Sequence, residues 1–173
     1  MQSTTYLQYM DSAARRAVPF ALTLFLMLFA LTPTYVPGLS DVAPMLTLMC
    51  VYFWSIYRPD LLGYGAAFGI GVLEDFLVGT PLGSGALVLL LCQRIVVHQH
   101  KFLNSRPFVV TWAAFAVVAM GAALVRWLCV GLVATGGFAP IGGLLAVYLM
   151  SVSTYPLVVW LLAKAQMKFL AET

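Results

Sequence analysis

Charge is what this sequence has least of. Charged residues make up 9% of its 173 residues, whereas hydrophobic residues make up 62%. Soluble domains carry roughly a quarter charged and half apolar residues, and a water-soluble globule with so few polar side chains could not cover its surface. The composition therefore excludes a soluble enzyme, a nucleic-acid-binding domain and a disordered protein. It favours an integral membrane protein with almost no mass outside the bilayer.

Cysteine and histidine are also scarce. Cys50, Cys92 and Cys129 lie inside apolar runs with no CxxC spacing, and thiols in such runs pack as small hydrophobes. His98 and His100 have no further ligand nearby, whereas structural zinc prefers four clustered ligands. Because no nucleophile, base and orienting group come together in the sequence, we expect no metal, no cofactor and no enzymatic activity.

Hydrophobic runs, in contrast, are abundant. A membrane-spanning helix needs roughly 20 mostly apolar residues, and Pro, Gly, Asn and Asp interrupt the chain at suitable intervals. The polar stretch 98–106 is predicted as the longest internal loop. The fold class is therefore predicted to be an all-α integral membrane protein, with six transmembrane helices in one compact bundle and a single domain, 1–173. The predicted spans are 18–33, 42–57, 60–78, 82–97, 107–134 and 141–163.

The basic residues predict the orientation of this bundle. If the two sides are numbered alternately, eight of the nine Lys and Arg residues fall on one side, and the other side has Asp41 and no basic residue. The positive-inside rule makes the basic side cytoplasmic. Tails 1–16 and 165–173 are then both cytoplasmic, which requires an even number of spans.

The N-terminus allows a second interpretation. Arg15 and Arg16 before a short apolar run resemble a secretory or twin-arginine signal. No clean small-x-small cleavage site follows in Thr32-Pro33-Thr34-Tyr35, so we favour a retained first span.

Three ionisable residues fall within the predicted hydrocarbon: Glu74, Asp75 and Arg126. Charges at that depth are expensive and mark a functional hypothesis. We predict that Arg126 pairs with Asp75, or as a second choice with Glu74, in the outer half of the bundle. The simpler interpretation is that the pair only locks two helices together. Adjacent carboxylates on a helix project about 100° apart, so a glycosidase-like acid–base pair is discounted.

The predicted third span carries small residues at four-residue spacing, which lets helix backbones approach closely in lipid. We therefore expect this helix to be central, with Asp75 facing inward along the same ridge. The small residues predicted to pack are Gly63, Ala67, Gly71, Gly79 and Gly83.

The predicted sixth span contains a proline among hydroxyl residues. Ser151, Ser153 and Thr154 precede Pro156, and their hydroxyls could satisfy carbonyls that the proline frees. A kink is the simpler interpretation, and a ligand-binding break as in transporter helices is the alternative.

Residues 44–85 resemble a known family. The pattern Phe-x-x-Gly-x-x-x-Asp followed by Gly-x-x-x-Gly is matched by Phe68, Gly71, Asp75, Gly79 and Gly83. With the neighbouring residues 52–60, it resembles the MreD family of rod shape-determining proteins, in its proteobacterial type. Glu74 departs from the family, which usually has an apolar residue or glutamine there.

The resemblance implies a function that composition cannot supply. Proteins of this family are non-enzymatic scaffolds of the rod (elongation) complex in the bacterial inner membrane, where they support lateral peptidoglycan synthesis and rod cell shape. The implied partners are MreC, a single-span membrane protein, and further RodA, a class B penicillin-binding transpeptidase and MreB. The fold is thought similar to the substrate-binding subunit of energy-coupling-factor transporters. That similarity leaves open a small-molecule or lipid-binding component of a membrane transporter.

Two surfaces are candidates for partner contacts. One is the outer half of the third span with its turn, 75–83. The other is the basic cytoplasmic face with Arg58, Lys101 and Arg106, although topology control and attraction to anionic lipid headgroups would explain these cations as well. In a scaffold the charged cluster should be paired and closed; in a transporter it should line an open pocket.

Overall fold

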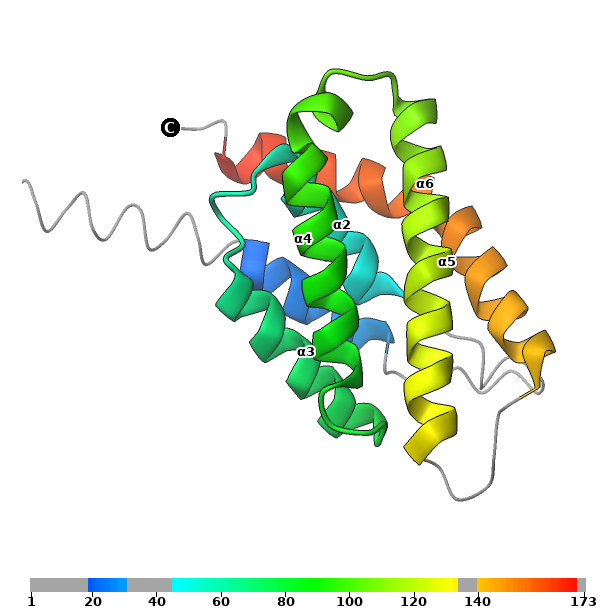
Figure 1. Ribbon diagram of the computed structural model, residues 1–173. Coiled ribbons are helices and arrows are strands. Elements are labelled where there is room, and N and C mark those ends of the chain that lie inside the picture. Colours follow the sequence, from blue (N-terminus) through cyan, green and yellow to red (C-terminus); the bar gives the residue numbers. More distant parts are fainter. Residues whose placement is uncertain (1–18, 31–44, 134–139, 171–173) are drawn as a thin grey trace, which may run out of the picture.

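The computed structural model describes residues 19–30, 45–133 and 140–170. Within these ranges the chain is helical apart from short turns (Figure 1). The helices are Pro19–Ala30, α2 (Leu46–Tyr57), α3 (Tyr64–Val78), α4 (Ser84–Asn104), α5 (Phe108–Val133) and α6 (Ile141–Leu170). The six helices follow the order of the six predicted segments. Arg15, Arg16, Asp41 and the tail 1–16 lie outside the described residues.

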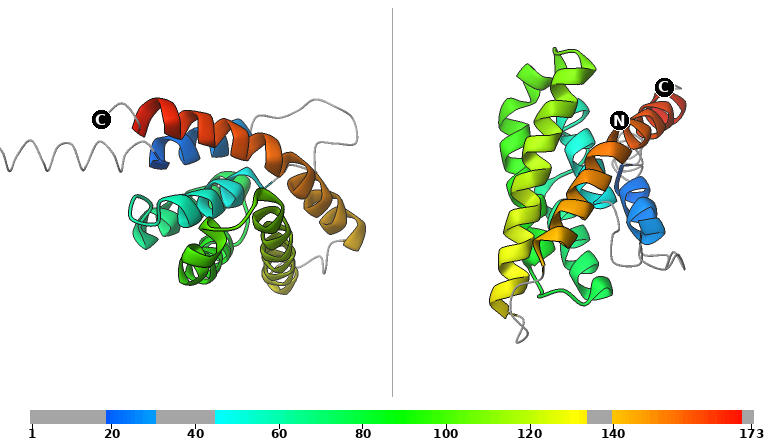
Figure 2. Two further views of the ribbon diagram at one scale, coloured as in Figure 1. Left: turned by 90° about the horizontal axis from the view of Figure 1, so that it is seen from above. Right: turned by 90° about the vertical axis from the view of Figure 1, so that its right-hand side faces the viewer.

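The helices form two layers around α2. Helices α3, α4 and α5 stand side by side in one layer, and α6 and the helix Pro19–Ala30 form the other (Figure 2). Helix α2 lies between the layers and contacts α4 on one side and α6 on the other. The core of the bundle therefore surrounds α2, rather than the third span as the sequence predicted.

Helix α2 can occupy this position because its sequence is apolar on every side. All residues from Leu46 to Ile56 are buried, which is typical of a helix that no solvent reaches. Two polar groups of this segment have partners on other helices: the Tyr52 hydroxyl donates to the carbonyl of Thr111 at 2.9 Å, and the backbone N–H of Met45 donates to Ser151 Oγ at 2.9 Å. These bonds connect the start of α2 to α6 and the middle of α2 to α5. The buried ring N–H of Trp54 has no hydrogen-bond partner among the described residues.

The small-residue ridge of α3 is only partly a packing surface. Ala67 and Gly71 are buried, and a Cβ on Gly71 would collide with the backbone of Ala86 in α4. The other three predicted positions do not pack, because a Cβ there would meet no atom within 4 Å; these are Gly63, Gly79 and Gly83. Gly63 precedes the helix, and the other two make the turn that follows it. The predicted close approach of α3 to a neighbour is thus concentrated at Gly71.

Two helices meet the length and composition needed to cross a membrane: Phe108–Val133 and Ile141–Met167. Pro19–Ala30 and Leu46–Tyr57 are shorter apolar helices. Helix α4 continues to Asn104, so the predicted loop 98–106 is mostly helical and only the short turn before Phe108 remains. The sequence prediction was wrong there because hydropathy indicates where a helix leaves an apolar layer and not where the helix ends.

Helix α6 runs without interruption through Pro156. A proline has no N–H for the carbonyl four residues earlier, here that of Val152. Trp112 Nε1 of α5 donates to this carbonyl at 3.0 Å, whereas the Ser151 hydroxyl donates to Val147 at 2.7 Å. The carbonyl freed by the proline is therefore satisfied by a neighbouring helix, not by the local hydroxyls that the sequence suggested.

We predict that Gly71→Ala destabilises the bundle by about 1–3 kcal/mol, because the new methyl group overpacks the contact with α4. Thermal unfolding of the purified protein in detergent would measure the change. Gly69→Ala is the matched control in the same helix, since a Cβ there meets no atom within 4 Å. Equal melting temperatures for the two variants would contradict the close approach at Gly71.

Candidate functional site

Asp75 is a buried acceptor at the end of α3. Its side chain is 0% exposed. The carboxylate accepts hydrogen bonds from Thr80 Oγ1 at 2.8 Å, Gly83 N at 2.9 Å, Ser84 Oγ at 3.0 Å and Gly85 N at 2.9 Å. Four donors from one turn and the next helix therefore converge on one carboxylate.

The local sequence explains this convergence. Gly79 and Gly83 have φ of +76° and +98°, a conformation that glycine adopts without a steric penalty. They reverse the chain so that the first N–H groups of α4 point back at Asp75. The N-terminus of a helix favours negative charge, so this end of α4 stabilises the Asp75 carboxylate. Gly85 admits the carboxylate, because a Cβ there would lie 2.7 Å from Asp75 Oδ1. Asp75 thus caps α4 and fixes its angle to α3.

Arg126 pairs with Glu74 and not with Asp75. Its Nη1 lies 3.0 Å from Glu74 Oε1, and the two side chains are 25% and 14% exposed. The preferred prediction, an Arg126–Asp75 pair, was wrong, because the turn and the start of α4 already supply the donors to Asp75. Glu74 projects from another side of α3, toward α5. Glu74, the second choice of the sequence prediction, is therefore the residue that binds the arginine.

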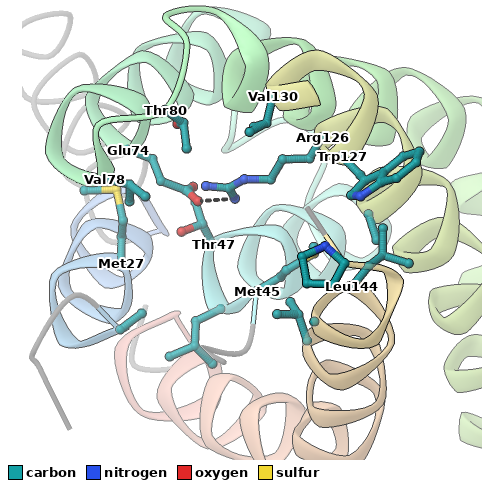
Figure 3. Close-up of a pocket in the computed structure, with 16 residues that line it drawn as sticks. Met27, Met45, Thr47, Glu74, Val78, Thr80, Arg126, Trp127, Val130 and Leu144 are labelled. Carbon is teal, nitrogen blue, oxygen red and sulfur yellow. Dashed lines mark hydrogen bonds and ion pairs between the residues drawn. The ribbon is translucent and has the colours of Figure 1, made fainter. Parts of the chain in front are cut away.

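The Glu74–Arg126 pair lies on the wall of a cavity of about 600 Å³. Figure 3 shows the Arg126 side chain reaching from α5 toward Glu74 of α3, with Thr47 of α2 nearby. Most of the remaining lining is apolar and comes from helix Pro19–Ala30, α5 and the start of α6. The lining residues are Met27, Ala30, Met45, Leu46, Thr47, Glu74, Val78, Thr80, Ala123, Arg126, Trp127, Val130, Pro140, Gly143, Leu144 and Val147. The cluster is thus both paired and beside open space.

Sequence reasoning found the charges of this site but not the cavity. Thr47, Trp127 and Gly143 come from three different helices and line it together. No spacing within one segment could have indicated this, because only the packing of α2, α5 and α6 brings them together. Among the described residues, no group of three or more His, Cys, Asp and Glu side chains could hold a metal ion.

The predicted basic face lies at the opposite end of the bundle from the cavity. Arg58 follows α2, Lys101 is in the last turn of α4, and Arg106 precedes α5. Tyr52 bonds to Thr111 near the start of α5, which places the C-terminal end of α2 at this same end. Lys101 and Arg106 are exposed and Arg58 is half-buried.

Comparison with known families identifies the chain. The model of the family described as rod shape-determining protein MreD matches residues 10–165, and the chain belongs to this family. Its members are rod shape-determining membrane proteins, and the family is not a known enzyme family. Searches of curated proteins and of solved structures gave no match.

We predict that Asp75→Asn lowers the free energy of unfolding by about 2–3 kcal/mol, because the amide cannot accept all the charge-assisted bonds that the carboxylate accepts. Thermal unfolding in detergent measures this loss. The control is Asp60→Asn, at an exposed position in the turn before α3, which should change stability by less than about 0.5 kcal/mol. Equal effects of the two changes would show that Asp75 does not cap α4.

A charge exchange should distinguish the two possible acid–arginine pairs. Glu74→Arg and Arg126→Glu should each lower the melting temperature, and the double variant should recover most of the loss, because it restores one ion pair between α3 and α5. Asp75→Arg combined with Arg126→Asp should not recover, since the donors at the start of α4 would lose their acceptor. If the melting temperature recovered in the Asp75→Arg, Arg126→Asp variant and not in the Glu74→Arg, Arg126→Glu variant, the Glu74–Arg126 contact would be refuted.

Proposed function

We propose that this chain is a non-enzymatic, multi-pass scaffold of the rod complex, of the proteobacterial type, in the bacterial inner membrane. It binds MreC and supports lateral peptidoglycan synthesis and rod shape, with RodA, a class B penicillin-binding transpeptidase and MreB as further partners. One observation carries the proposal beyond family membership. Asp75 accepts hydrogen bonds from the turn and the start of α4, and Glu74 pairs with Arg126, so these charges join helices to each other and leave the exposed helix faces to partners.

The orientation of the scaffold follows from its two ends. We propose six spans with both termini cytoplasmic, because Arg58, Lys101 and Arg106 gather at one end and the Gly79–Gly83 turn lies at the other. Basic residues are retained on the cytoplasmic side during insertion. The cytoplasmic end is then the one available to MreB, and the cavity belongs to the periplasmic half.

The outward face of α3 is the surface we assign to MreC. Phe68 is 52% and Phe76 is 74% exposed. A Cβ on Gly65 or Gly69 would meet no atom within 4 Å, so the backbone of α3 is accessible at these positions to a neighbouring helix. Small residues flanked by large ones are typical of close helix–helix contacts in lipid. This face therefore suits the single membrane helix of MreC.

The predicted partner surface 75–83 needs one refinement. Asp75 is buried and cannot touch a partner directly, whereas Phe76, Val78 and Leu82 on the same segment are exposed. Asp75 holds the turn, and the turn then presents these apolar side chains. Within this surface, the proposed contact residues are therefore the exposed ones.

Site-specific cross-linking tests the scaffold. Cys50, Cys92 and Cys129 are replaced first, and single cysteines are then placed at Gly69 or Phe76 on α3. We expect adducts to a co-expressed MreC-like single-span protein from both positions. Leu132→Cys on α5 is the control, because that residue is 78% exposed on another helix. Equal adducts from all three positions, or none, would contradict the assignment of this face.

The second candidate is a ligand-binding component of a membrane transporter, on a fold similar to energy-coupling-factor subunits. The cavity of about 600 Å³ favours it. It predicts a tightly bound small molecule in the purified protein together with no α3 adducts. The scaffold remains our conclusion, because the family match covers residues 10–165 and the two charges beside the cavity are paired with each other.

A further inference from the structure

The cavity has polar groups concentrated in one part and apolar walls elsewhere. Figure 3 shows Glu74, Arg126 and Thr47 gathered together, while Met27, Met45 and Leu144 lie around the rest of the space. Its volume of about 600 Å³ falls within the roughly 300–1,000 Å³ range of small-molecule sites. This distribution matches a ligand with one polar end and one apolar part.

The polar part is only partly satisfied by the protein. A guanidinium has five N–H donors, and within the described residues Arg126 makes one hydrogen bond, from Nη1 to Glu74 Oε1. In the same part of the chain the second carboxylate oxygen of Glu74 has no protein donor. The site therefore has free donors and a free acceptor side by side.

The charges restrict the kind of molecule that fits. The pair is neutral overall, so a net anion drawn to Arg126 would also meet the Glu74 carboxylate, and a net cation would meet the guanidinium. A purely apolar molecule would leave the guanidinium donors without acceptors. A headgroup that carries one negative and one positive charge can contact both residues.

The position of the pair is compatible with a headgroup. Glu74 precedes the Gly79 turn by five residues, or about 7.5 Å at 1.5 Å per residue. The Glu74–Arg126 pair thus lies near the end of the bundle opposite Arg58, Lys101 and Arg106. A lipid of the leaflet at that end could place its headgroup there and an acyl chain among the apolar lining residues.

We propose that this cavity binds one zwitterionic phospholipid of the phosphatidylethanolamine kind. Its phosphate accepts hydrogen bonds from the free guanidinium N–H groups of Arg126, and its ammonium group donates to Glu74. Part of an acyl chain fills the space between Met27, Met45 and Leu144. The site borders the surface assigned to MreC at Val78, which lines the cavity, and it extends the scaffold function with a structural lipid.

The test measures retained lipid by native mass spectrometry. Full-length protein is reconstituted in vesicles of equal phosphatidylethanolamine and phosphatidylglycerol, extracted in mild detergent and delipidated stepwise. We expect one retained phosphatidylethanolamine per chain, preferred over phosphatidylglycerol by about tenfold, the ratio that one charge-assisted hydrogen bond gives. Equal retention of both lipids, preference for phosphatidylglycerol, or retention of a different small molecule would overturn the proposal.

A matched glycine pair tests the location. Gly143 lines the cavity, Gly142 is its neighbour in the first turn of α6, and a Cβ on either meets no atom within 4 Å. Gly143→Trp should abolish retention of the lipid, whereas Gly142→Trp should leave it unchanged. Equal retention by both variants would place the lipid elsewhere and overturn the proposal.

Glu74→Gln tests the headgroup chemistry. Removing the carboxylate charge should reduce the tenfold preference to about one, because the ammonium group loses its partner and the anionic lipid loses a repulsive neighbour. An unchanged preference would overturn the assignment of the ammonium group to Glu74. If this variant does not fold, the glycine pair still decides the proposal. Both readouts are independent of cross-linking to MreC.

Discussion

The arrangement of the end of the bundle that holds the α3–α4 turn depends on a single carboxylate. Asp75 has no counter-cation within hydrogen-bond distance among the described residues, and it is stabilised instead by hydroxyl and backbone donors from the turn and the start of α4. Burying a charge without such donors would be strongly unfavourable. The close approach at Gly71 and the position of Glu74 both follow from the α3–α4 angle that Asp75 fixes.

The neighbouring acids Glu74 and Asp75 have different partners, and this difference determines what the site can bind. Asp75 is saturated by the chain itself, so Glu74 is left to meet Arg126 across the bundle and to border the cavity. An Arg126–Asp75 pair would have placed the guanidinium at the turn and left Glu74 isolated in an apolar environment. The observed pairing instead joins α3 to α5 with a neutral pair whose remaining hydrogen-bonding capacity faces the cavity.

Much of the helical framework was predictable, because apolar runs separated by Pro and Gly mark helices directly. Helix α5 begins and ends within a residue or so of its predicted bounds. What could not be predicted depended on contacts between segments. The four-residue spacing of small residues placed the third span at the centre, but α2 occupies that place and is buried from Leu46 to Ile56. The sequence contains two acids, Glu74 and Asp75, that could pair with Arg126. The hydrogen bonds from the α3–α4 turn and the start of α4 engage Asp75, so Glu74 is the partner.

The central position of α2 has a consequence for how the protein is made. At 12 residues and 1.5 Å per residue, α2 is about 18 Å long, well short of the roughly 30 Å hydrocarbon layer. Such a helix is a poor candidate for independent partitioning into lipid as it leaves the translocon. Its hydrogen bonds to α5 and α6 come from segments synthesised later. The packing around α2 can therefore be completed only after α5 and α6 have been synthesised.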